Sequence, residues 1–266
     1  NAKPIERALP IVTILTLSAT GSEMDAGGVI TNLETQDKLG RMAAPMLPKV
    51  SFLDPTLTYT VSPYQTACGA ADMMSHILEV YFNLNEDLFM LDSMMEAMLK
   101  TIVKFAPVAI AEPENYEARA NLMWCSSWAI NGFINGGRRK AWSCHPMEHE
   151  LSAIYDIAHG HGLAILTPRW MEYCLEESNA HRYVSLGVNV FGIDPKGEPM
   201  AIAKECIERM REFMSVTLNL PYTFTEVGIK REDFATMARK ACRYGAIRGF
   251  KTLEPQDVER IYEMCI

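Results

Sequence analysis

Apolar residues at helical spacing fill the sequence from about residue 62 to its end, and this pattern constrains the fold more than any other feature. Serine or glutamate before proline marks helix boundaries, as at Ser62-Pro63 and Glu254-Pro255, while Glu112-Pro113 ends a helix. The pattern predicts a helical unit of about 200 residues. The predicted helices span residues 65–82, 87–111, 116–134, 147–155, 162–176, 181–190, 201–218, 231–244 and 255–264.

The first 61 residues have a different character. Residues 10–17, 27–31 and 49–53 are short segments rich in β-branched or apolar side chains and bounded by Gly, Pro or Asp, which is typical of strands. So few strands cannot close a core alone. We therefore predict a mainly α fold: a multihelical domain at 62–266, preceded at 1–61 by a few strands from an incomplete α/β domain whose earlier part is missing from this chain.

Composition limits the classes of molecule that the protein is expected to bind. The chain has 266 residues and a net charge of −8, which disfavours nucleic acid and anionic membranes, and no apolar run approaches the roughly 18 residues of a membrane span. Seven scattered cysteines without a CxxC pair indicate reduced thiols and a cytoplasmic protein. Glu6 and Pro10 argue against a signal peptide at the apolar start. A small neutral molecule is the expected partner.

Histidines supply the strongest functional signal, since five of the six fall between residues 76 and 161. Asp72 and His76 stand at i and i+4, on one face of a helix; His145 and His149 repeat that spacing, and His159 follows. Either pair alone would usually be a helix-surface pair. Their neighbours are small or apolar, however, and buried charge without a partner is costly. Together they predict one divalent-metal site, with imidazole and carboxylate ligands that suit Fe²⁺ or Zn²⁺.

A metal of this kind, with an open position and no thiolate ligand, polarises the oxygen of an alcohol or carbonyl. Because neither metal need change valence, a hydride would have to come from an organic cofactor. The loop at residues 16–23 (TLSATGSE) offers hydroxyls and backbone N–H groups suited to ribose or phosphate, although it is not a GxGxxG motif and also fits an ordinary turn. Lys38 could reach a phosphate.

At this level of detail the chain resembles the iron-containing (group III) alcohol dehydrogenases, especially their butanol dehydrogenase and NADPH-dependent aldehyde reductase branch. The resemblance covers essentially the whole chain and is carried by ATGSEM at 19–24, FLDP at 52–55, TYT at 58–60, DMMSH at 72–76, EPENY at 112–116 and HPMEHELSAIYDIAHG at 145–160. It implies a nucleotide-binding α/β half, a helical metal half and a homodimer.

The resemblance also implies residue roles. The metal ligands would be Asp72, His76, His145 and His159, with His149 beside the substrate as part of a proton relay. Cofactor contacts would come from Thr16, Thr20 and Lys38, with Leu57 in the segment that lines the cofactor cleft. NADP(H) is expected rather than NAD(H), from the branch alone.

Two departures from the family pattern stand out. The Gly-Gly-Gly-Ser phosphate loop is absent because the chain begins too late, and Asp25 stands where relatives commonly have Asn. Two alternatives stay open: a lyase of the dehydroquinate synthase type, for which the basic residues near the site are chiefly at 138–140, and an inactive metal-domain fragment. An apolar pocket, favouring short aliphatic substrates, is expected from Phe133, Trp142, Met147 and Ile154.

Overall fold

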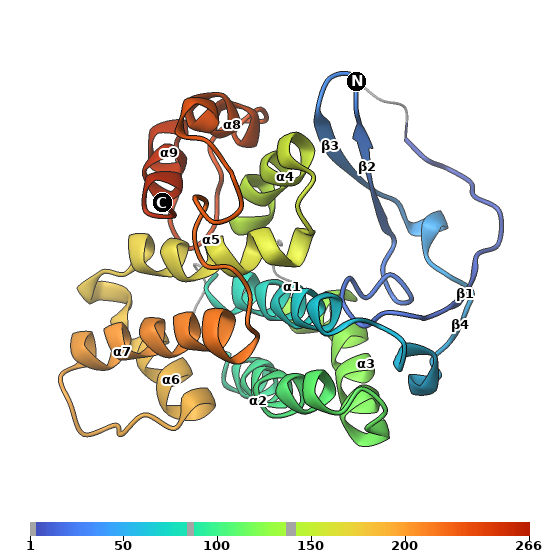
Figure 1. The fold of residues 1–266 in the computed structure, drawn as a ribbon, viewed down its shortest axis with the longest axis horizontal. Coiled ribbons are helices and arrows are strands. Elements are labelled where there is room, and N and C mark those ends of the chain that lie inside the picture. Colours follow the sequence, from blue (N-terminus) through green and yellow to red (C-terminus); the bar gives the residue numbers. More distant parts are fainter. Residues whose placement is uncertain (1–3, 84–87, 137–141) are drawn as a thin grey trace.

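The computed structural model describes residues 4–83, 88–136 and 142–266. Within these ranges a body of α-helices lies beside a thinner layer of strands (Figure 1). The helices are α1 (Pro63–Tyr81), α2 (Phe89–Ala111), α3 (Tyr116–Ile130), α4 (Cys144–Tyr155), α5 (His159–Cys174), α6 (Ala180–Phe191), α7 (Pro199–Glu212), α8 (Phe234–Ala241) and α9 (Pro255–Glu263). The strands are β1 (Val12–Ile14), β2 (Gly27–Asn32), β3 (Asp37–Met42) and β4 (Val50–Phe52). The predicted mainly α fold is therefore confirmed.

Helix α1 is the centre of the helical body. It begins where the sequence predicts, with the Ser62 side chain accepting from the backbone N–H of Gln65 and Pro63 in the first turn. Every residue from Thr66 to Tyr81 is buried, because α2, α3 and α5 pack around it. Polar side chains on this helix must consequently find partners inside the protein.

Glycine allows a close crossing of α1 and α5. A Cβ on Gly160, the second residue of α5, would lie 1.9 Å from the carbonyl oxygen of Cys68 in α1. No side chain fits at that distance, so the two helix backbones approach each other where only glycine is tolerated. The crossing brings the first residue of α5, His159, next to the middle of α1.

Two helices begin three residues earlier than predicted. Helix α4 begins at Cys144 rather than residue 147, and α5 begins at His159 rather than Gly162. Pro146 does not delay α4, because the first turn of a helix has no use for the N–H that proline lacks. Gly160 at the start of α5 serves the close packing just described, whereas Gly162 lies against the Glu148 side chain. His145 and His159 therefore each lie in the first turn of a helix.

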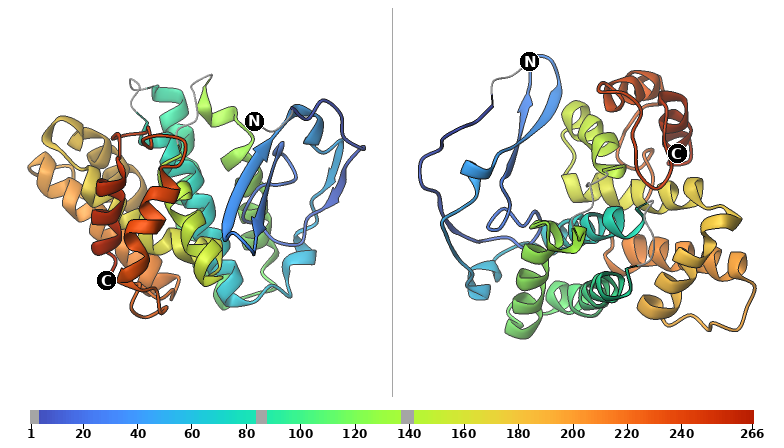
Figure 2. Two further views of the ribbon diagram at one scale, coloured as in Figure 1. Left: turned by 90° about the horizontal axis from the view of Figure 1, so that it is seen from above. Right: turned by 180° about the vertical axis from the view of Figure 1, so that it is seen from behind.

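The strands form two separate pairs. β1 and β4 run parallel, with Val12 opposite Val50, whereas β2 and β3 form an antiparallel hairpin, with Gly27 opposite Met42 (Figure 2). β3 was not predicted, because its sequence DKLGRM lacks both β-branched residues and a clear alternation. The division into domains at residue 62 stays a prediction.

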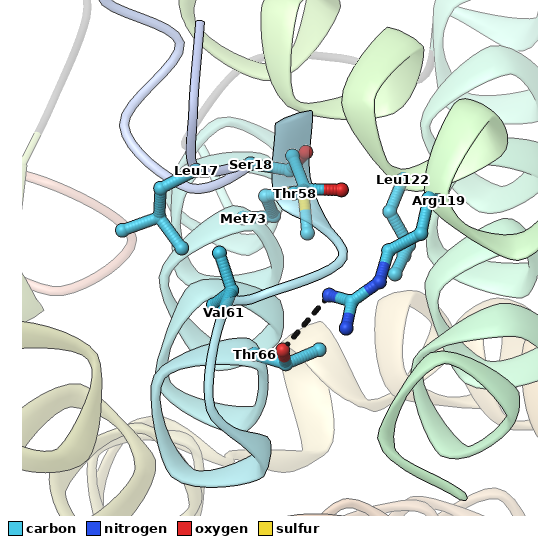
Figure 3. A pocket seen from close by; sticks show the side chains of 8 residues that line it. All are labelled: Leu17, Ser18, Thr58, Val61, Thr66, Met73, Arg119 and Leu122. Carbon is cyan, nitrogen blue, oxygen red and sulfur yellow. Dashed lines mark hydrogen bonds between the residues drawn. The ribbon is translucent and has the colours of Figure 1, made fainter. Parts of the chain in front are cut away.

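Arg119 of α3 connects α3 to α1, next to the segment that precedes α1. Its buried guanidinium donates to the Thr66 hydroxyl at 2.9 Å and the Pro113 carbonyl at 2.8 Å, beside a cavity also lined by Ser18 and Thr58 (Figure 3). That cavity, of about 10 Å³, has room for a single water. Among the described residues, no helix is both long and apolar enough to cross a membrane.

Candidate metal centre

Three helices bring one carboxylate and three imidazoles close together. Ligand atoms of Asp72, His145 and His159 all lie within 4.8 Å of one another, a group that does not include His76. Asp72 Oδ1, from α1, lies 3.4 Å from His76 Nε2, one turn along the same helix. It lies 3.7 Å from Nε2 of His145 at the start of α4, and 3.7 Å from Nε2 of His159 at the start of α5. Two ligands each about 2.1 Å from a tetrahedral metal are about 3.4 Å apart, so these spacings suit a common metal ion.

The environment of these atoms also fits a metal. Asp72 Oδ1 and His145 Nε2 are buried and have no hydrogen-bond partner among the described residues. Burial alone would raise the pKa of Asp72, but the imidazoles of His76, His145 and His159 outweigh it and hold that pKa well below its usual range. An ionised, unsatisfied carboxylate oxygen is costly to bury, and a divalent cation at this point would satisfy it.

Two buried carboxylates hold the imidazoles from behind. Glu79 contacts His145 Nδ1 at 2.5 Å, and Glu148 contacts His159 Nδ1. Burial by itself would lower the pKa of His145. The carboxylates of Glu79 and Asp72 together outweigh burial and raise this pKa to about 9 without a metal. A carboxylate on Nδ1 leaves Nε2 for a metal, which is the common arrangement around protein-bound zinc.

A second group of candidate ligand atoms, on Glu148, His149 and His159, lies beside the first. Lys38 occupies it: its ammonium is 3.4 Å from Glu148, 3.1 Å from the Ser152 hydroxyl and 3.3 Å from His159 Nδ1. Burial raises the pKa of Glu148, but His159 and Lys38 lower it to about 2. Because the Lys38 ammonium already lies in this group, the group that includes Asp72 is the better candidate for a metal.

His149 stands one helical turn after His145 and faces the same space. Its ring centroid is 6.4 Å from that of His145 and 5.5 Å from that of His159. Burial lowers the pKa of His149 to about 3, so its imidazole is neutral at pH 7. A neutral imidazole beside the candidate ligands can accept or relay a proton.

These residues form one wall of a cavity of about 780 Å³. Its other walls come from the β2–β3 hairpin, from Ile130 and Trp142, and from the segment at residues 240–247. The volume exceeds that of a short alcohol and falls in the range of cofactor sites. The metal centre therefore opens onto a space that can hold a second, larger molecule.

An ionic network fixes the hairpin against the helical body. Asp37, at the start of β3, contacts Arg243 at 2.8 Å and Lys240 at 3.2 Å. Both cations also contact the buried Glu150 of α4, at 2.6 Å and 3.5 Å. The lysine additionally donates to the Gln36 carbonyl at 2.5 Å. The turn end of the hairpin is thus held beside the cavity.

Comparison with known proteins decides the family. Residues 66–266 match the family described as "Fe-containing alcohol dehydrogenase family, C-terminal". Residues 1–55 match the family described as "Iron-containing alcohol dehydrogenase". The chain belongs to the iron-containing alcohol dehydrogenase family. The resemblance seen in the sequence is confirmed, and the family favours an oxidoreductase over the dehydroquinate synthase type of lyase. The basic residues at 138–140, the chief candidates in the sequence for the substrate clamps that such a lyase needs, lie outside the described residues.

Individual members of the iron-containing alcohol dehydrogenase family are similar to this chain in sequence and structure over most of its length. The chain is 50% identical to NADH-dependent butanol dehydrogenase A of Clostridium acetobutylicum over 97% of its own length and 67% of the relative's. It is 33% identical to the NADPH-dependent aldehyde reductase YqhD of Escherichia coli, over 92% of this chain and 62% of that protein. The crystal structure of NADH-dependent butanol dehydrogenase A from Thermotoga maritima superposes with a TM-score of 0.93 at 36% identity, covering 99% of this chain and 67% of that one. The chain thus spans about two thirds of the length of these relatives.

Not all residues predicted for the cofactor lie together. Thr20 and Lys38 line the 780 Å³ cavity, as does Asp25. Thr16 and Leu57 are exposed and do not line it. Their roles as cofactor contacts stay predictions, as do those of Thr20 and Lys38.

Of the four residues expected to form an apolar pocket, only Trp142 lines the cavity. Met147 and Ile154 instead pack into the helical core, and Phe133 makes an edge-to-face contact with Trp128. The expectation was wrong for these three because helical spacing places them on faces of their elements that turn away from the cavity. Its apolar lining comes from Val29, Leu39, Met42, Ile130 and Ile247 instead.

Proposed function

We propose that the protein is a metal-dependent, nicotinamide-linked alcohol dehydrogenase acting as an aldehyde reductase, with Asp72, His76, His145 and His159 as the metal ligands. One observation supports this most strongly: the Asp72 oxygen and the His145 Nε2 atom are buried, at the edge of a cavity of about 780 Å³, and have no hydrogen-bond partner among the described residues. Family membership supports the same conclusion.

The overall reaction converts aldehyde, NAD(P)H and a proton into alcohol and NAD(P)⁺. A divalent Fe or Zn ion, when bound, supplies Lewis-acid polarisation of the substrate oxygen. A nicotinamide cofactor, when bound, would supply or accept the hydride. Neutral His149 would relay the proton by accepting one on one ring nitrogen while releasing one from the other. The walls of the cavity orient the two reactants, a contribution that lowers the entropic part of the barrier.

The names of the relatives bear on whether the protein uses NADH or NADPH. The sequence branch implies NADP(H), whereas the relatives at 40–50% identity are named as NADH-dependent and YqhD, at 33%, as NADPH-dependent. On identity we propose NADH as the preferred cofactor. The ratio of kcat/KM for NADH and NADPH with one aldehyde measures this, and a ratio below one restores the prediction of NADP(H).

Short aliphatic alcohols and aldehydes are the proposed substrates. The apolar lining from Val29, Leu39, Met42 and Ile247 supports this class, as do the names of the butanol dehydrogenase relatives. Faster turnover of a polyol such as glycerol than of butanol would contradict it. A homodimer and a cytoplasmic location stay predictions from the sequence, and light scattering measures the first.

The experiment that tests the proposal pairs metal analysis with turnover. Protein purified without oxygen should carry close to one Fe²⁺ or Zn²⁺ per chain and oxidise NAD(P)H in the presence of butyraldehyde. Asp72→Ala and His145→Ala should lose both the metal and the activity. Near-stoichiometric metal in both variants would remove the proposed site.

A further inference from the structure

Glu79 is a buried glutamate of α1 that the proposed reaction does not use. It is only 2% exposed. Asp72, His76 and Glu79 stand at i, i+4 and i+7, so the three side chains share one face of the helix. The carboxylate therefore lies in line with two of the proposed metal ligands, one turn beyond them.

Both oxygens of Glu79 are fully engaged. Oε1 accepts from the Ser75 hydroxyl at 3.0 Å and contacts His145 Nδ1 at 2.5 Å. Oε2 accepts from the backbone N–H of Cys144 at 3.0 Å and from that of Ser143. These two N–H groups lie at the start of α4, where a helix has unsatisfied donors. One carboxylate thus holds both the first turn of α4 and the imidazole that this turn carries.

We propose that Glu79 is a positioning residue for the metal centre: it orients His145 so that Nε2, rather than Nδ1, faces the metal. The reasoning is a hydrogen count. Since a carboxylate has no hydrogen to donate, the imidazole must donate from Nδ1, and the neutral ring then carries its lone pair on Nε2. That atom lies 3.7 Å from Asp72 Oδ1.

Glu148 makes the comparable contact to His159 but is connected differently. Its carboxylate also contacts Lys38, which belongs to the β2–β3 hairpin. The contacts of Glu79 with Ser75, Ser143, Cys144 and His145 lie within α1 and the start of α4. Glu79 accordingly fixes its ligand from inside the helical body, independent of the hairpin and of any cofactor.

The inference rests on the proposed metal site, and its test measures zinc binding rather than turnover. The variants are Glu79→Gln and Glu79→Asp, and the readout is the Zn²⁺ dissociation constant from competition with a chromophoric chelator. An amide has one acceptor oxygen, so Gln must give up either the imidazole or the helix start; Asp keeps the charge but is too short to reach both. Glu96→Gln is the matched control, because this buried glutamate of α2 bonds Tyr81 and Asn189 and no proposed ligand.

We expect Glu79→Gln to weaken zinc binding about 10- to 100-fold, the usual effect of losing a group that orients a ligand. Glu96→Gln should lower the melting temperature without changing zinc affinity. Nitrogen-15 NMR of the zinc-bound protein should show a neutral His145 with its proton on Nδ1 in the parent and a mixture of tautomers in Glu79→Gln.

Unchanged zinc affinity in Glu79→Gln, or the same loss in Glu96→Gln, would overturn the inference. If Glu79→Gln does not fold, Glu79→Asp decides in the same way: weaker zinc binding supports the inference, and parental affinity refutes it. Failure of the parent protein to bind zinc would instead refute the proposed metal site itself, so the two ideas fail separately.

Discussion

Gly160→Ala tests whether the crossing of α1 and α5 sets the geometry of the metal centre. The new Cβ would lie 1.9 Å from the Cys68 carbonyl oxygen and 2.5 Å from its carbon, so α5 must move away from α1. Reaching even 3.0 Å, the closest distance that real Cβ atoms show, requires a shift of about 1.1 Å. Metal–ligand distances tolerate only about 0.2 Å.

The shift separates His159, which directly precedes Gly160, from Asp72, one turn after Cys68. The present Nε2 to Oδ1 distance of 3.7 Å would then no longer suit a shared metal. We expect zinc affinity to fall at least about 10-fold. Overpacking should also lower the free energy of unfolding by about 1–3 kcal/mol, which corresponds to a drop of about 2–10 °C in melting temperature.

Chelator competition measures the zinc affinity, and circular dichroism measures the melting temperature. Gly187→Ala in α6 is the matched control. Its Cβ would meet only side-chain atoms, 3.0 Å from Ile193 and 3.1 Å from Cys206, and no proposed ligand is near. Gly160→Ala with parental zinc affinity would refute the argument that this crossing positions His159.

Three further predictions concern the metal, the hairpin and the core. Removing zinc with a chelator should lower the unfolding free energy by about 2.7 kcal/mol relative to protein at a free zinc concentration of 100 times Kd, and equal melting temperatures would contradict a site in the folded state. Asp37→Ala removes the contacts of this carboxylate to Lys240 and Arg243 but no proposed ligand. It should therefore speed hydrogen exchange of the β2–β3 amides and leave zinc affinity unchanged. Unaltered exchange would show that the ionic network does not hold the hairpin. Asp92→Ala should cost about 3–5 kcal/mol in urea unfolding, since it leaves Arg182 buried without the carboxylate that now contacts it at 2.7 Å and 3.1 Å; a loss below 1 kcal/mol would contradict this.

The sequence was informative where the physics is local. Helical periodicity and the proline boundaries predicted all the α-helices of the described residues, because each depends on side chains a few positions apart. The i, i+4 spacing of Asp72 and His76 likewise predicted which side chains share a face. Such statements need no knowledge of which helix packs against which.

Features that depend on distant partners were missed. Glu79 and Glu148 look like ordinary polar positions in the sequence, and their importance comes from contacts with His145 and His159, which other segments of the chain carry. The i+7 position of Glu79 after Asp72 was a readable signal, since a third acidic or basic residue on the same buried face requires a partner. Strand β3 had no such signal, because its pairing with β2 comes from backbone hydrogen bonds.

Charge explains why the centre suits a divalent ion and why Lys38 lies where it does. Three buried carboxylates, Asp72, Glu79 and Glu148, surround the imidazoles, and one ammonium group, that of Lys38, lies among them. With neutral imidazoles, these four described groups carry a net charge of −2, which a divalent cation would cancel. A monovalent ion would leave a buried charge, which is costly in a medium of low dielectric constant. Lys38 contributes to the same charge balance, because its ammonium neutralises Glu148 beside the proposed ligands. The candidate ligand atoms form two groups, but with Lys38 in the second group one metal ion is enough to balance the charge.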